Sequence, residues 1–201
     1  MTEKTKLNAA ERLLSAPKQI DPLDDKTMEY LFKRVESAYL KGKTKIIGPY
    51  KGSTIFTFGD NENGYYGLIR PDNELLYAVK YTSVTPRRFG RQVLVARRRT
   101  HTDAARIAEH IFFELLLPRF GALTTDTQQT ERGQDFWTYV VSDAFEKNLH
   151  VYRIDHFKSV GSKLTYLPTI EDFNSIVAST WGKTDWYLTK GIIISIKPIT
   201  E

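Results

Sequence analysis

Residues 65–84 read YYGLIRPDNELLYAVKYTSV, and this stretch decides the fold. Residues 65–70 and 75–84 are rich in the aromatic and aliphatic side chains that favour strands, and the second run alternates two faces. Between them, PDNE at 71–74 is a turn sequence. A third apolar run, QVLVA at 92–96, follows a basic turn. Three consecutive extended runs joined by turns predict an antiparallel meander.

Helical and extended segments alternate after the meander. Apolar residues at helical spacing predict a long helix that Thr102 or Asp103 caps and that stops before Pro118. Residues 121–126 predict a short strand, which a second helix and a strand at 149–155 follow. A strand–helix–strand connection is right-handed and its strands are parallel. We therefore expect an α/β (α+β mixed sheet) fold: an antiparallel meander followed by a strand–helix–strand–helix–strand unit.

The flanking segments predict one domain preceded by an arm. Residues 1–23 are polar and contain two prolines, which indicates a flexible N-terminal arm, and residues 24–201 form a single domain. The domain begins with a helix that ends near Gly42. After the strand–helix unit we expect a polar loop, a helix at 171–179 and a closing strand at 192–196.

The composition is that of a globular protein and excludes several kinds of chemistry. Hydrophobic residues make up 41% of the 201 residues and aromatic residues 12%, too many for a disordered chain. The absence of cysteine excludes disulfides and thiolate nucleophiles, and with four histidines we expect no metal site. The sequence shows neither a signal peptide nor a membrane-spanning run, so we expect a soluble cytoplasmic protein without a membrane partner.

Basic residues concentrate in one short segment. The net charge is only +5, but residues 87–99 contain no acid and carry a cluster of arginines, namely Arg87, Arg88, Arg91, Arg97, Arg98 and Arg99. Such clusters bind phosphate, either in nucleic acid or in a phosphorylated cofactor. A solvated connection between a strand and a helix is the alternative interpretation.

Two short motifs lie at the starts of the predicted helices. Residues 99–104, RTHTDA, match the pattern Q/R-x-x-G-x-G/A at Arg99 and Ala104, with Thr102 in place of the central glycine. Residues 130–137, TERGQDFW, match a small-residue and aromatic pattern, with Trp137 where a tyrosine is usual. With these motifs, the segment 92–155 resembles the core of the GNAT superfamily of acyl-CoA-dependent acyltransferases. The runs IFFELL and DTQQT within it are most similar to small GNAT-like proteins encoded by tailed bacteriophages.

The resemblance implies that an acetyl or acyl group moves from acetyl-CoA, or another acyl-CoA, to an unknown amine acceptor. It implies a cofactor site made by Val95, Arg97, Arg98, Arg99, Thr102 and Ala104. A helix N-terminus suits the pyrophosphate because its N–H groups are unpaired and its partial charge is positive. Asp103 opposes an anion there, so an ordinary capped helix is the alternative.

The reaction also needs a base for the amine and an acid for the leaving thiolate. Asp126, at the end of its strand, is the best-placed base, with Glu109 or Glu114 as substitutes. Trp137 cannot supply the proton, because its indole N–H is not a practical acid at neutral pH, so we expect Tyr152 to act as the acid. A cap or turn role for Asp126 is the alternative.

Two further functions compete with the acyltransferase. One is a catalytically inactive GNAT-fold phage protein that binds a host protein or nucleic acid, as a counter-defence or host-takeover factor in the bacterial host cytoplasm. The other is a nucleic-acid-binding domain that uses residues 87–99. The exchanges at Thr102 and Trp137 favour the inactive protein over the enzyme, whereas the order of the elements favours both over the nucleic-acid domain.

Overall fold

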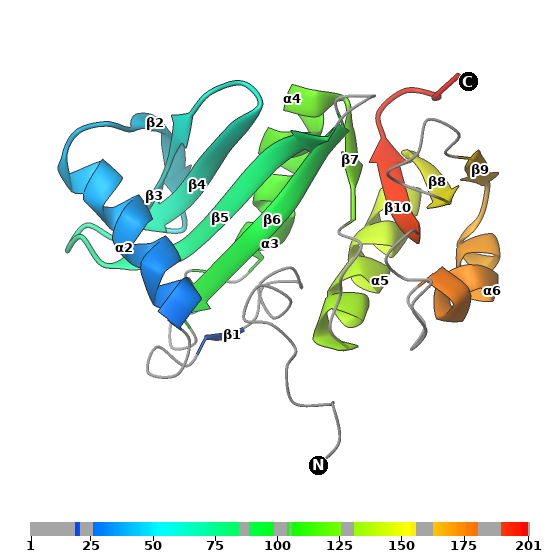
Figure 1. Cartoon of the computed structure of the whole chain (residues 1–201), viewed down its shortest axis with the longest axis horizontal. Coiled ribbons are helices and arrows are strands. Elements are labelled where there is room, and N and C mark those ends of the chain that lie inside the picture. Colours follow the sequence, from blue (N-terminus) through cyan, green and yellow to red (C-terminus); the bar gives the residue numbers. More distant parts are fainter. Residues whose placement is uncertain are drawn as a thin grey trace, which may run out of the picture.

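A mixed sheet runs through the whole molecule (Figure 1). The computed structural model describes residues 19–20, 26–84, 89–98, 104, 106–125, 131–155, 163–180 and 190–200. Its strands are β1 (Gln19–Ile20), β2 (Lys45–Tyr50), β3 (Ser53–Gly59), β4 (Asn63–Ile69), β5 (Leu75–Val84), β6 (Phe89–Arg98), β7 (Ala122–Thr124), β8 (His150–Asp155), β9 (Lys163–Leu167) and β10 (Lys190–Ser195). Their order across the sheet is β2-β3-β4-β5-β6-β7-β10-β8-β9, and β1 pairs with β6.

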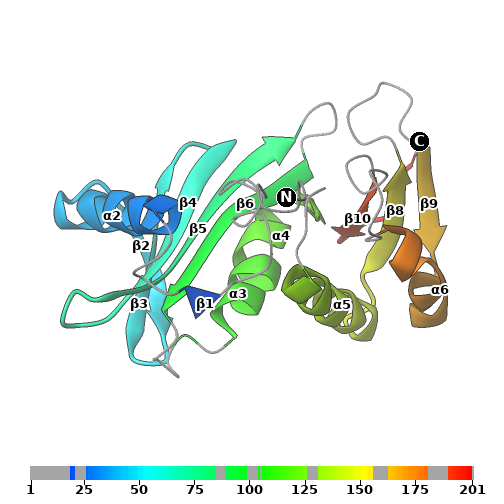
Figure 2. The same ribbon diagram turned by 60° about the horizontal axis from the view of Figure 1, so that its bottom comes forward.

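Helices cover the two faces of the sheet unequally. They are α2 (Lys26–Leu40), α3 (Ile107–His110), the π-helix η3 (Ile111–Leu116), α4 (Leu117–Phe120), α5 (Glu131–Glu146) and α6 (Ile170–Thr180). Figure 2 shows α2 over one face and the other helices over the opposite face. Leu31 and Val35 of α2 are fully buried against Phe56, Ala78 and Ala96 of the sheet. We call this the α2 face and the other the helix-rich face.

The helix-rich face holds the larger core. It includes Tyr77, Val79 and Tyr81 of β5, which share one face because alternate strand residues point to the same side. The same core takes in Ile111 and Phe112 of the π-helix, together with residues of α5, α6, β8 and β10. One continuous apolar cluster therefore joins the two halves of the sheet.

The predicted meander and crossover are confirmed at the level of strand pairing. Strands β4, β5 and β6 pair antiparallel, and β2 and β3 extend the same meander. Strand β7 is parallel to β6, and β10 inserts between β7 and β8 with antiparallel pairing on both sides. The fold is thus mixed α/β with a large, mostly antiparallel sheet.

Two sets of sequence expectations are wrong. The first concerns both ends of the long helix, which does not start at Thr102 or Asp103: α3 begins at Ile107, after Arg106, whose left-handed φ of 59° interrupts any earlier turn. The long helix does not stop before Pro118, because α4 carries the chain on to Phe120 and ends at Gly121, which has a φ of 71°. Proline needs room against the preceding turn and has no N–H; here it lies in the first turn of α4, where the missing donor is tolerated. The preceding turn is widened, since Leu117 donates to Phe112 in the π-helix pattern.

The second error concerns β9, where we expected a polar loop. Leu167 is the one buried residue of β9, and the strand is held mainly by its pairing with β8 rather than by burial of its side chains. Among the described residues, no helix is long and apolar enough to cross a membrane. Of the predicted arm, the structure describes only β1.

Candidate functional site

Strands β6 and β7 separate soon after they meet. Among the described residues they pair through Gly90 with Leu123 and Arg91 with Thr124. Strand β6 continues to Arg98, and β1 pairs with its last two residues, Arg97 and Arg98. No other described strand pairs with residues 92–96 on this edge. We call residues 92–96 the open edge.

Two buried polar side chains stand where the strands part. Gln92 would pair next with Thr125 if the ladder continued, and they are 6% and 1% exposed. Gln92 lies opposite Tyr81, which places it on the helix-rich face. Thr125 directly follows the last residue of β7, and its hydroxyl lies against the Ile192 N–H of β10.

Gln92 and Thr125 differ in their hydrogen bonds. The Nε2 atom of Gln92 is buried and has no hydrogen-bond partner in the described part of the chain. The Thr125 hydroxyl accepts a bond from the Ile192 N–H at 2.9 Å, and the Thr125 N–H donates to the Ile192 carbonyl at 2.8 Å. Thr125 is thus fixed in place, whereas the Gln92 amide is left with an unused donor. Buried polar groups are seldom left unpaired, so such a donor marks a place for a ligand or water.

The other end of the open edge carries two more unpaired donors. Arg97 lies opposite Tyr77 on the helix-rich face, and the Nε of Arg97 is buried without a partner. Tyr77 is fully buried, and its hydroxyl has no partner among the described residues. Burial raises the pKa of Tyr77 despite the opposing effect of Arg97, so the phenol stays protonated and keeps a hydrogen to donate. This end suits an anionic or acceptor group.

The predicted cofactor residues do not all lie together. Arg98 points to the α2 face, where its Nε donates to the Leu75 carbonyl at 2.9 Å and its guanidinium covers the Phe32 ring at 5.2 Å. Val95 and Ala104 are buried in the core of the helix-rich face. Among the described members of the set, Arg97 has a buried side-chain donor without a partner. Outside the described residues lie Arg87, Arg88, Arg99, Thr102 and Asp126.

Tyr152 lies on the α2 face, not the helix-rich face, with an exposed fraction of 6%. Its hydroxyl accepts a hydrogen bond from the Ile199 N–H at 2.9 Å, which leaves the phenolic proton to be donated. Trp137 is buried in the core, with its ring edge-on to Phe112 at 5.4 Å between centroids. Trp137 therefore acts as a packing residue.

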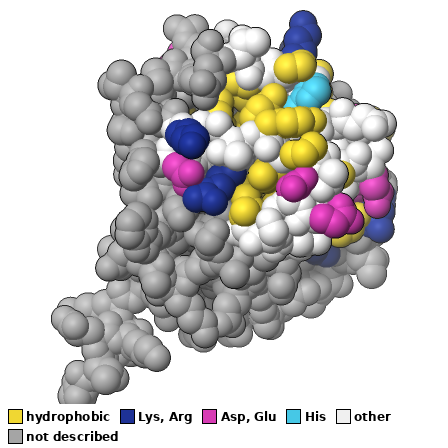
Figure 3. Space-filling view, turned by 90° about the vertical axis from the view of Figure 1, so that its right-hand side faces the viewer, with side chains coloured by type: hydrophobic (Ala, Val, Ile, Leu, Met, Phe, Trp, Pro, Cys, Tyr) yellow, Lys and Arg dark blue, Asp and Glu magenta, His cyan; other side chains and the backbone are white. Residues whose placement is uncertain are grey.

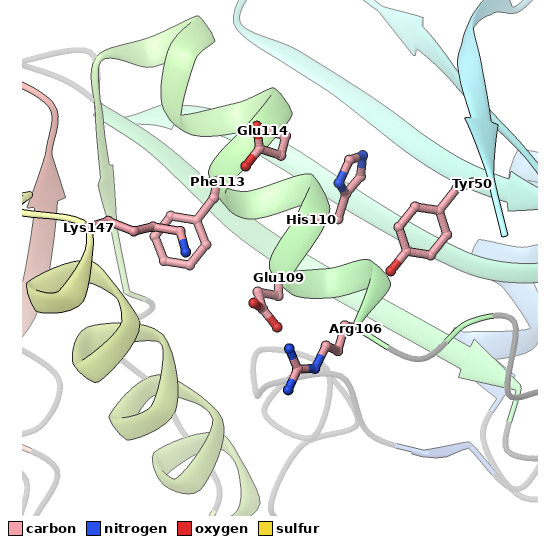
Figure 4. A pocket seen from close by; sticks show the side chains of 7 residues that line it. All are labelled: Tyr50, Arg106, Glu109, His110, Phe113, Glu114 and Lys147. Atoms are coloured by element: carbon pink, nitrogen blue, oxygen red, sulfur yellow. The ribbon is translucent and has the colours of Figure 1, made fainter.

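A shallow pocket of about 200 Å³ opens on the outer side of α3 (Figure 4). It is lined by Tyr50, Arg106, Glu109, His110, Phe113, Glu114 and Lys147. Glu109 accepts a bond from the Tyr139 hydroxyl at 3.4 Å, and Lys147 is held by Asp143 at 2.9 Å. Burial and Glu109 raise the pKa of Tyr50, while Arg106 and Arg97 lower it. Glu109 and Glu114, the substitute bases, thus face this pocket rather than the fork.

The far edge of the sheet presents a different surface. Figure 3 views the molecule from the side of β9 and shows hydrophobic side chains gathered beside a histidine, with charged side chains around them. Tyr166 of β9 is 50% exposed and Ile196 is 41% exposed. The Tyr166 ring lies 5.3 Å from that of Tyr152 and 6.1 Å from that of His150. We call these residues the β9 surface.

Comparison with protein-family models, curated proteins and solved structures finds no match for this chain. Within the described residues, no group of three or more histidine, aspartate or glutamate side chains can hold a metal ion. The function is therefore inferred from the fork, the open edge and the residues at its two ends. The sequence did not single out Gln92, although a glutamine at the start of an apolar strand run was a usable signal.

Proposed function

We propose that this protein is a GNAT-like acyltransferase that moves an acetyl or acyl group from acyl-CoA to an amine. The observation that carries the proposal is the open edge of β6, bounded by β7 at one end and by β1 at the other. A parallel strand pair that is joined through helices and parts after two residue pairs agrees with the family resemblance of residues 92–155.

The open edge fits the long arm of the cofactor. The path from Gln92 to Arg97 covers about 16 Å at about 3.3 Å per residue. The pantetheine arm of acyl-CoA is an extended chain of comparable length that contains two amide groups. Those amides can pair with the backbone of 92–96 as an added strand would.

The positions of the charged and donor groups predict the direction in which the ligand lies along β6. Arg97 and Tyr77 supply buried donors at the end where the chain leaves β6, and the resemblance adds Arg99 and Thr102 there. A pyrophosphate at this end directs the acyl group towards the fork at Gln92. Charge-assisted bonds to phosphate are the strongest contacts such a site can make.

The chemistry then follows the family pattern. The amine nitrogen attacks the thioester carbon, Asp126 takes the amine proton, and the carbon–sulfur bond breaks. Tyr152 would supply the proton to the departing thiolate from the α2 face, the opposite side of the sheet from Gln92 and Arg97; its hydroxyl accepts from the Ile199 N–H and keeps its own hydrogen to donate. Both roles are proposals for these two residues.

Calorimetric titration with acetyl-CoA tests the proposal. The wild-type protein should bind saturably, and Arg97→Gln should weaken binding by about tenfold, since a bond to a charged group contributes roughly 1.5 kcal/mol. Arg34→Ala, on the exposed side of α2, is the matched control and should bind as the wild type does. No binding at millimolar acetyl-CoA would overturn the proposed acyltransferase function.

The β9 surface favours a second candidate function, an inactive protein of the same fold that binds a host macromolecule. Exposed Tyr166 and Ile196 beside an edge strand are typical of a protein-binding surface. This function predicts that Tyr166→Ala abolishes binding to the host partner while Arg97→Gln leaves it unchanged. A partner held through residues 87–99 would instead be nucleic acid, and its affinity would fall steeply with salt.

A further inference from the structure

We propose that the end of the sheet at β2 binds an acidic, partly apolar segment of a partner protein. It lies at the opposite edge of the sheet from β9 (Figure 1). The inference does not depend on the acyltransferase function, because β3, β4 and β5 separate β2 from the open edge of β6. We call this region the β2 surface, and it consists of Leu40, Lys41, Lys43, Lys45, Ile46 and Ile47.

The charge of the β2 surface has one sign. Residues 37–59 contain four lysines and no acid. Lys41, Lys43 and Lys45 are exposed, and in the described part of the chain no ion pair holds any of them. The Asp60 carboxylate, in the neighbouring turn, accepts bonds from two backbone N–H groups of that turn. The surface therefore presents positive charge that no side chain of these residues neutralises.

Aliphatic side chains are exposed among these lysines. Leu40 is 64% exposed, Ile46 is 53% exposed and Ile47 is 40% exposed. Ile46 pairs with Phe56, which belongs to the core of the α2 face, and the Phe56 ring lies 4.8 Å from that of Tyr39. Leu40 follows Tyr39 directly and ends α2. Leu40 and Ile46 thus flank the same contact, at the end of α2.

The connection between α2 and β2 is well ordered by hydrogen bonds. Gly42 has a φ of 64°, and its N–H donates to the Tyr39 carbonyl at 2.9 Å. The Lys43 N–H donates to the Ala38 carbonyl at 3.0 Å. These two bonds form the Schellman motif that often ends helices. Because the backbone that carries the lysines is already fixed, less conformational entropy is lost on binding.

Ordinary structural roles explain the lysines but not the aliphatic side chains. Cations after the end of a helix interact favourably with its dipole, and lysines on an edge strand discourage pairing with another sheet. Neither role requires Leu40, Ile46 and Ile47 to be exposed, and their contact with water forgoes the stabilisation that burial would give. Apolar side chains that gather on a surface and are rimmed by polar ones mark a contact with another molecule.

The composition of the β2 surface selects the kind of partner. A second copy of the chain would place like charges against each other, which is unfavourable. Nucleic acid is bound through aromatic side chains that stack on bases, whereas the exposed apolar side chains of this surface are aliphatic. An acidic segment with apolar side chains complements both the lysines and the aliphatic residues.

The backbone of β2 limits how that segment binds. Pro49 has no N–H, and the register with β3 shifts between Ile46 and Gly48. A partner strand therefore cannot pair along the whole of β2. The segment is held instead by ion pairs with the lysines and by packing on the aliphatic side chains.

Selection from a random peptide library on the full-length protein tests the charge of the partner. We expect the enriched peptides to be rich in aspartate, glutamate and apolar residues, and their binding to weaken as salt is added. The double variant Lys43→Gln, Lys45→Gln should bind a selected peptide about fivefold to tenfold more weakly, as expected for the loss of two exposed ion pairs. Lys163→Gln with Lys197→Gln removes the same charge from exposed positions at the other end of the sheet and should bind as wild type does.

The aliphatic half of the surface is tested separately with the same peptide. Ile46→Ser should weaken binding by about fivefold and leave its salt dependence unchanged, because it removes apolar area but no charge. Leu40→Ser should act in the same direction. Ile196→Ser, which is 41% exposed in wild type and lies at the other end of the sheet, is the matched control and should bind normally. Thermal unfolding shows which variants are folded, and the folded ones among the three substituted sites decide.

Two results would overturn the proposal. The first is enrichment of peptides without an excess of acids, or equal binding of a selected peptide by wild type and by the folded variants of the β2 surface. The second is displacement of the peptide by a labelled single-stranded oligonucleotide that binds more tightly, because the partner would then be nucleic acid. Neither result affects the titration with acetyl-CoA, so the acyltransferase function is judged independently.

Discussion

Gly90 lies where β6 pairs with Leu123, one residue before the strands begin to part. A Cβ at this position would collide with the Phe120 ring and with the Leu123 side chain. The absence of a side chain therefore lets α4 and β7 approach β6 at the base of the fork. Single residues of this kind decide where the ladder stops.

We predict that Gly90→Ala destabilises the protein by about 1–3 kcal/mol, the usual cost of overpacking. Denaturant unfolding measures the change. Gly48→Ala is the control, because nothing lies within 4 Å of the added Cβ, and it should change stability little. A Gly90→Ala protein as stable as the control would show that Phe120 and Leu123 move aside freely.

Trp137 is the second residue whose size matters. It is 3% exposed and packs edge-on against Phe112 and Phe136. We expect Trp137→Ala to cost about 3–5 kcal/mol, because it removes a large buried ring and leaves a cavity. Tyr139→Ala, on the same helix but 44% exposed, should cost far less in the same urea titration. Equal losses would contradict a packing role for Trp137.

At the scale of elements, the turn between β3 and β4 depends on one carboxylate. Asp60 accepts bonds from the N–H groups of Asn63 at 2.6 Å and Glu62 at 2.8 Å, and these bonds hold its pKa below the ordinary value. Arg119 of α4 donates to the Asp60 carbonyl at 2.7 Å, which ties the turn to the helix. The turn thus links the meander to the crossover.

Because the pKa of Asp60 is lowered in the folded protein, its contribution to the stability of the fold depends on pH. A carboxyl with a lower pKa in the folded state stabilises the fold above its unfolded pKa, and this is lost as pH falls through the folded pKa. Asp60→Ala should therefore be less stable than wild type near neutral pH, with a gap that narrows in acid. Unfolding midpoints at about pH 7 and about pH 3 test this. Asp60→Asn keeps the acceptor oxygen without the charge, so its loss should be smaller and less dependent on pH.

The elements that the sequence predicted are those with strong periodicity. The helix ending near Gly42, the meander, the parallel crossover and the helix containing Trp137 all carry apolar patterns that local rules recognise. The continuation through Pro118 depends on a π-turn, which no local pattern encodes. Strand β9 is set by its neighbour rather than by its own residues.

The same limit applies to the candidate site. Arg97 was predicted from charge alone. It points to the opposite face of the sheet from Arg98 because successive strand residues alternate, and the pairing of β6 with β5 also contains a bulge. Gln92 and Thr125 are far apart in sequence, and each directly follows the last residue that pairs β6 with β7. Local sequence rules give the residue types, and tertiary pairing determines which of them meet.

At the scale of the whole molecule, the two halves of the sheet meet, within the described residues, through two strand residue pairs between β6 and β7. The core of the helix-rich face bridges them, since it contains residues of both halves and of α3, α5 and α6. We predict a single cooperative unfolding transition, because neither half keeps a complete core alone. Tryptophan fluorescence and far-ultraviolet circular dichroism should give coincident denaturation curves. Separate midpoints would show that the halves unfold independently.

Strand β1 has a consequence for the size of any molecule that lies along β6. It occupies the same edge as β7, and its pairing with Arg97 and Arg98 begins where residues 92–96 end. The described strand pairs thus lie at both ends of residues 92–96, with β7 at one end and β1 at the other. An extended backbone of up to about 16 Å lies between them at about 3.3 Å per residue. If an extended ligand pairs along β6 as proposed, a longer one competes with Gln19 and Ile20 for the backbone of Arg97 and Arg98.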